Sequence, residues 1–246
     1  MSAFAIRIEE DRVHVFTDAV YADANGVITG FRPTFHALAH WPAVVLVIGA
    51  GPAEHPIVAD LAWRFDCIDA LAASAADFME EACAQRAALF DKPASDFQII
   101  AAGWSRRREK PRVLEMRRSA SGRDFAVTEH DRTLLSTALS QEALFFAGLS
   151  EEEIEATDPA TYALATLGGM RAMHLLGLGP PVGGYLLAAD VSANGIFEYR
   201  RPVKDWEKDS VGLRIGERKA VDGQRLPRVE EGPLTFVVAP DNGGEH

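Results

Sequence analysis

The chain has little cysteine, and this limits the covalent and metal frameworks that it could use. Its 246 residues include only Cys67 and Cys83. Both lie in segments with a helical pattern, so neither a disulfide framework nor a thiolate metal cage is indicated. We expect both to be reduced core residues.

A membrane-spanning run is also missing. The longest apolar stretch, Ala43 to Gly51, is about half of the roughly 20 residues that a membrane helix needs. The opening residues lack the cationic and apolar pattern of a secretory leader. These features predict a cytoplasmic protein with no membrane partner.

Basic residues are outnumbered, with 25 Lys and Arg against 36 Asp and Glu, and the net charge is -11. Such a balance repels phosphate backbones, so nucleic acid is not an expected partner. A Walker lysine, a Gly-x-Ser-x-Gly elbow and a paired metal motif are all lacking. His36 and His40 have a spacing that could admit a metal, but no third ligand is in register. We expect no cofactor and no metal.

Alternating apolar residues predict strands in several parts of the chain. Phe4 to Ile8 and the run from Val13 form a first hairpin, and Ser192-Ala193-Asn194-Gly195 joins two late strands. Those late strands span 184–191 and 195–201, and further strands are expected at 27–30, 34–38, 43–48, 97–104, 113–116 and 124–128.

Helical periodicity takes over from Ala53 to Leu89, where the break at 65–69 favours two helices. Short helices are expected between Glu129 and Thr157. Asp158-Pro159 then opens a clear amphipathic helix that Gly177 closes.

Antiparallel hairpins on either side of helix pairs favour two packed sheets covered by helices. The expected fold is α+β, a four-layer αββα sandwich of two antiparallel sheets flanked by helices. We place this domain at residues 1–201. Residues 202–246, rich in charge, Gly and Pro, are interpreted as a partly ordered C-terminal extension.

The element order and several motifs resemble the proteasome β-type subunits and their bacterial relatives among the Ntn hydrolases. The resemblance rests on the opening Ser2 to Ile8, on Asp18 after Val15-Phe16-Thr17, and on the strand 44–49 before helices. It covers roughly residues 2–200, as pattern more than identity. The chain is also similar to bacterial and prophage-associated proteins of this fold.

The resemblance implies a site at the chain's beginning. In that family an N-terminal Thr, Ser or Cys is the nucleophile and its own amine is the base. Ser2, freed of Met1, would take this role, and Asp18 lies sixteen residues later, as the family's aspartate does. Gly49 corresponds to the glycine whose N–H stabilises the oxyanion. Thr34, however, stands where the family has its lysine.

Other parts of the family's site have weak counterparts. Ser136 and Ser140 are candidates for its serine, and 180–184 holds no convincing aspartate. Losing one member of a catalytic unit usually removes most of its advantage. We therefore predict a degenerate catalytic site and an assembly or binding role.

Two alternatives stay open beside that prediction. One is an N-terminal-serine amidohydrolase or peptidase that uses Ser2. The other is a small-molecule binding module in the same cleft. The resemblance further implies a homo-oligomer, with other assembly proteins as candidate partners.

Overall fold

The computed structural model describes residues 3–23, 25–38, 40–49, 53–89, 98–118, 125–131, 134–135, 153, 157–177, 181–203, 206 and 209–216. The strands and helices are, in chain order, β1 (Phe4–Ile8), β2 (Arg12–Asp18), β3 (Val20–Ala22), β4 (Ile28–Phe31), β5 (His36–Ala37), β6 (Ala43–Ile48), α1 (Glu54–Arg64), α2 (Ile68–Ala73), α3 (Ala75–Leu89), β7 (Gln98–Ser105), β8 (Lys110–Arg118), β9 (Phe125–His130), β10 (Leu134–Leu135), α6 (Pro159–Leu175), β11 (Leu186–Ser192) and β12 (Gly195–Arg201).

One sheet has the order β10-β1-β2-β11-β12, and all its neighbouring strands are antiparallel. β2 is central: Thr17 pairs with Phe4 of β1, and Asp18 pairs with Leu186 of β11. The end of β2 therefore lies between strands from the beginning and the end of the described chain, and Asp18 is placed beside both.

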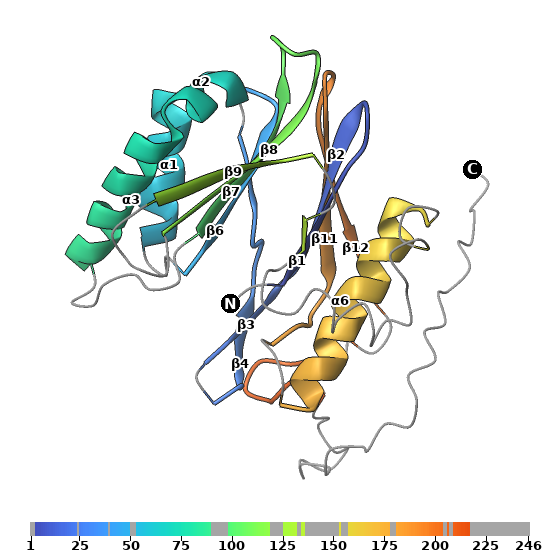
Figure 1. Ribbon diagram of the computed structural model, residues 1–246. Helices are drawn as coiled ribbons and strands as arrows, with labels where there is room; N and C mark the ends of the chain where they lie inside the picture. The colour runs from blue at the N-terminus through green and yellow to red at the C-terminus, as the bar shows by residue number, and fades with distance from the viewer. Residues whose placement is uncertain are drawn as a thin grey trace, which may run out of the picture.

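The second sheet is an antiparallel meander in the order β5-β6-β7-β8-β9. β3 and β4 form a separate antiparallel pair. Figure 1 shows the two larger sheets side by side, with α1, α2 and α3 beyond one of them and α6 beyond the other. The fold is thus mixed α/β with antiparallel sheets.

Three clusters of buried apolar residues hold these parts together. The cluster between the sheets joins residues of β1, β2 and β11 to residues of β6, β7 and β8. A second cluster packs α1, α2 and α3 on the other face of the meander, and a third packs α6 on the first sheet. Each large side chain buried in this way contributes roughly 1.5–3 kcal/mol. Members of the cluster between the sheets include Phe4, Ile6, Val13, Val15, Val44, Leu46, Ile100 and Val113.

Local sequence explains where α6 begins. The Asp158 carboxylate accepts hydrogen bonds from the N–H groups of Ala160 and Thr161, at 3.2 and 3.0 Å. Pro159 follows at the first helical position, where its missing N–H costs nothing. The prediction of this helix is confirmed.

The expectation of two helices between Ala53 and Leu89 is wrong, because the structure has three. The predicted break near Phe65 separates α1 from α2, and a second break occurs at Ser74. Cys67 lies outside the helices and caps α2, its Sγ accepting from the N–H of Ala70 at 3.4 Å. β9 and β10 also occupy parts of 129–157 where short helices were expected, and most of that stretch lies outside the described residues.

Residues beyond the expected domain boundary contact the body of the molecule. Trp206, Leu213 and Ile215 are buried, and the N–H of Ile28 donates to the carbonyl of Leu213 at 2.8 Å. We refer to residues 206 and 209–216 as the C-terminal segment. Among the helices of the described ranges, none combines the length and the apolar character needed to cross a bilayer.

Candidate functional site

Asp18, the predicted site aspartate, is fully buried at the end of β2. Its Oδ1 accepts the N–H of Ala3 at 3.2 Å, and its Oδ2 accepts the N–H of Gly183 at 3.1 Å. In return, the N–H of Asp18 donates to the carbonyl of Ala3 at 3.4 Å. One carboxylate therefore fastens the start of β1 and the turn before β11.

The electrostatic setting of Asp18 is unusual for a carboxyl group. Burial raises its pKa to about 7, although the N–H groups of Gly183 and Ala3 act in the opposite direction. No Lys, Arg or His of the described ranges forms an ion pair with it. The group is held by neutral donors, so it gains a proton far more readily than a surface aspartate.

Thr34, at the position where the resemblance implies a lysine, is buried next to Asp18. Its Oγ1 donates to the backbone carbonyl of Asp18 at 2.8 Å. The hydroxyl thus joins the loop before β5 to the end of β2 through the backbone and does not contact the carboxylate.

Gly49, another predicted site residue, makes its hydrogen bond with a different part of the chain. Gly49 follows β6 with a φ of 78°, and its carbonyl accepts from the Nε of Arg86 at 2.7 Å. No hydrogen bond within the described ranges joins Gly49 to Asp18. Ser2 lies outside the described residues, as do Ser136 and Ser140.

A second polar group, which no sequence pattern predicted, lies at the start of α1. Glu54 is buried, with its Oε1 2.7 Å from the Nε2 of His36 and its Oε2 3.6 Å from an Nη of Arg32. Arg32 also stacks over the ring of Tyr21, 3.8 Å from its centroid. Burial raises the pKa of Tyr21 and the charge of Glu54 adds to this effect, whereas Arg32 acts in the opposite direction.

The two histidines with the four-residue spacing point to different partners. His36 binds Glu54, whereas the Nε2 of His40 lies 3.0 Å from the carbonyl of Phe65. Across the described ranges, no three His, Cys, Asp or Glu side chains come together as a metal site would require.

A buried ion pair next to Asp18 was also missed. Arg171 on α6 binds Asp209 through two hydrogen bonds of 2.7 and 2.9 Å and donates a third to the carbonyl of Val182. Asp209 also accepts the N–H of Gly184 at 3.0 Å. Adjacent N–H groups of the 183–184 turn therefore bind two buried carboxylates, one from β2 and one from the C-terminal segment. A helical Arg and a distant Asp carry no local signal that predicts this pairing.

A scan against protein-family models finds no match to this chain, and a search of curated proteins finds none either.

Proposed function

We propose that this chain has the αββα fold of the Ntn hydrolases, is a relative of the proteasome β-type subunits, and has an assembly or binding role in place of hydrolysis. The packing supports this fold class. Two five-stranded antiparallel sheets share one apolar cluster, and helices cover their other faces.

The surroundings of Asp18 carry the proposal for a degenerate site. A lysine beside this aspartate would keep it ionised and would help to activate the nucleophile. Thr34 supplies only a neutral hydroxyl, which it donates to the backbone. Because members of a catalytic unit act together, the loss of the lysine removes most of the expected rate advantage.

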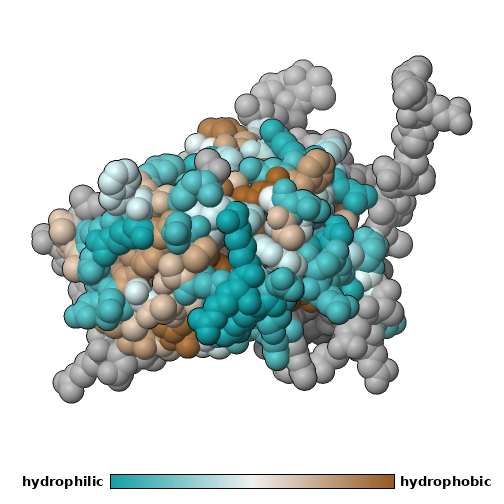
Figure 2. All heavy atoms as spheres, turned by 90° about the horizontal axis from the view of Figure 1, so that it is seen from above, coloured by the Kyte–Doolittle hydropathy of each residue, from teal (hydrophilic) through white to brown (hydrophobic). Residues whose placement is uncertain are grey.

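Exposed aromatic residues support a binding role. The side chain of Trp63 on α1 is 90% exposed, and that of Phe197 on β12 is 67% exposed. Trp and Phe are enriched among interface residues because they bury a large apolar area with few rotatable bonds. Figure 2 shows a mainly hydrophilic face in which hydrophobic residues form small, separate groups.

One observation favours the alternative, an amidohydrolase or peptidase that uses Ser2. The N–H of Ala3 belongs to the peptide bond that follows Ser2, and Asp18 accepts it. The aspartate therefore contacts the residue that follows Ser2, and a hydrolase of this class needs its aspartate close to the nucleophile.

Labelling of Ser2 separates the two functions. The untagged protein would first be analysed by intact mass and N-terminal sequencing, and then treated with a serine-reactive electrophile. We expect no Ser2-dependent adduct and the same result for Ser2→Ala. A stoichiometric adduct on a free N-terminal Ser2, absent in Ser2→Ala, would overturn the proposal and establish the hydrolase. Light scattering on the same sample measures the expected homo-oligomer.

A further inference from the structure

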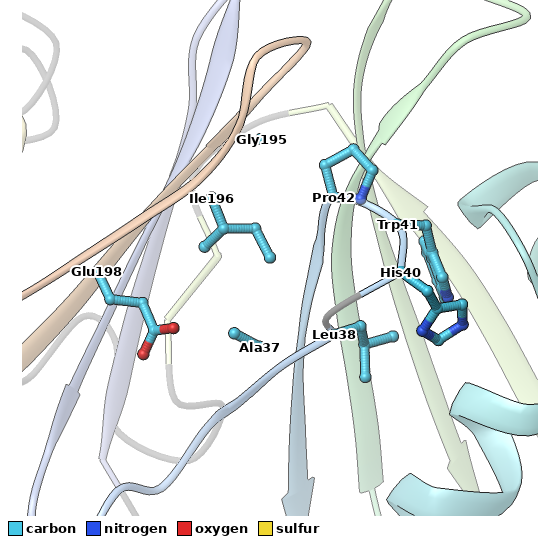
Figure 3. A pocket seen from close by; sticks show the side chains of 8 residues that line it. All are labelled: Ala37, Leu38, His40, Trp41, Pro42, Gly195, Ile196 and Glu198. Atoms are coloured by element: carbon cyan, nitrogen blue, oxygen red, sulfur yellow. The ribbon is translucent and has the colours of Figure 1, made fainter.

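A groove of about 450 Å³ opens between β5 and β12, the edge strands of the two large sheets (Figure 3). Within the described part of the chain, β12 pairs with β11 alone and β5 with β6 alone. Among the described residues, both strands thus have one edge without a partner strand at this position. The lining residues are Ala37, Leu38, His40, Trp41, Pro42, Gly195, Ile196 and Glu198.

The strand register determines which backbone groups of β12 point away from β11. Ser192 pairs with Gly195 across a two-residue turn, and the ladder continues with 190 opposite 197. In an antiparallel ladder, every second residue uses its N–H and C=O within the pair, and the residues between direct theirs outward. Ile196 and Glu198 are therefore the residues with outward backbone groups, and both line the groove.

The side chains around this edge define what could pair with it. Leu38, Pro42 and Ile196 provide apolar surface, and no cation of the described ranges forms an ion pair with Glu198. Phe197, on the opposite face of the strand, is largely exposed. A strand added here would present one residue to Ile196 and, two positions away, another to Glu198.

The geometry points to a site for an extended peptide segment of a partner protein, bound as an added antiparallel strand along β12. The segment carries a Lys or Arg opposite Glu198 and an apolar residue two positions later, opposite Ile196. Main-chain hydrogen bonds provide the affinity, and the alternating side chains provide the selectivity, as in other cases of strand addition.

The inference rests on the proposed function in assigning a binding role, but it concerns a different part of the molecule. Failure of the proposed function would appear as labelling of Ser2. Failure of the peptide site would appear in a binding titration, so the two outcomes are distinguishable.

A fluorescent probe, Thr-Thr-Lys-Thr-Val-Thr-Thr, tests the site by anisotropy with the full chain. We expect saturable binding that Glu198→Lys weakens about tenfold, because an attraction becomes a repulsion. A probe with Glu in place of Lys should show the reverse preference. Glu80→Lys, an equal charge change at an exposed position of α3, should leave binding unchanged.

N-methylated probes test the main-chain pairing. Methyl groups on the nitrogens of the Lys and Val remove the N–H groups that face β12, and binding should fall at least about tenfold. A methyl group on the nitrogen of the central Thr, whose N–H points away, should have little effect. Absence of saturable binding, or equal binding by both methylated probes, would overturn the proposal. A dimer formed through β12 that excludes the probe would also overturn it, in favour of a second copy as the occupant.

Discussion

The substitution Asp18→Asn should change how the stability of the protein depends on pH. The carboxyl group has an ordinary pKa of 3.8 and a pKa of about 7 in the fold, where burial penalises its charge. Between these two values the folded state binds one proton more than the unfolded state. The free energy of unfolding contributed by Asp18 is therefore present in full below about pH 4 and is lost as the pH rises to about 7.

The size of this effect follows from the two pKa values. One unit corresponds to about 1.4 kcal/mol, so the full change is about 4 kcal/mol. The asparagine side chain of the variant cannot titrate, and the stability difference between wild type and Asp18→Asn isolates the contribution of Asp18. That difference should fall by up to about 4 kcal/mol from pH 4 to pH 8.

Urea unfolding at several pH values, followed by circular dichroism, measures the difference. Asp69→Asn is the control. Asp69 is partly buried, but hydrogen bonds from Ser105 and Arg112 outweigh its burial and lower its pKa. Its stability difference should be constant from about pH 5 to pH 8. A difference for Asp18→Asn that is equally constant, or that grows as the pH rises, would refute the reasoning.

Three further substitutions test the hydrogen-bond network at the 183–184 turn and the ion pairs of His14. Asp209→Ala leaves Arg171 buried without its partner and should cost about 3–5 kcal/mol in urea unfolding; a loss below about 1 kcal/mol would contradict the network. Gly183→Ala places a Cβ in steric overlap with an Oδ of Asp209, which predicts a loss of stability of about 1–3 kcal/mol. The double variant Gly183→Ala/Asp209→Ala should lose less stability than the two single variants added together, because the overlap is gone. Burial disfavours the charged form of His14, but hydrogen bonds to Asp190 and Glu9 outweigh it and raise its pKa. The stability advantage of wild type over His14→Gln, measured by thermal unfolding, should therefore shrink as the pH rises past neutral, and an advantage that grows would contradict this assignment.

Much of the secondary structure could be predicted because its signals are local. Alternation predicted the first hairpin and the pair joined at Ala193-Asn194, and the structure confirms both as β1–β2 and β11–β12. The cap at Asp158 likewise gave the start of α6. The helix count between 53 and 89 was wrong, because Ser74 interrupts a stretch whose apolar period continues on both sides.

The candidate site was only partly accessible from the sequence. The resemblance to the Ntn hydrolases pointed to Asp18 through its spacing from Ser2, and the structure shows Asp18 buried and hydrogen-bonded to Ala3. The bond between Asp18 and Gly183 joins residues 165 positions apart, and the pair Arg171–Asp209 spans 38. Such contacts arise from sheet register and helix packing, which composition and periodicity do not contain.

The shared turn at Gly183 and Gly184 connects the two ends of the described chain. Gly183 donates to Asp18, which holds the start of β1, and Gly184 donates to Asp209, which holds the C-terminal segment. Protonation of Asp18 removes the cost of burying its charge, whereas ionisation strengthens the hydrogen bonds that it accepts from Gly183 and Ala3. A change in the charge of Asp18 therefore acts on the same turn that binds Asp209, so the start of β1 and the C-terminal segment are linked through Gly183 and Gly184.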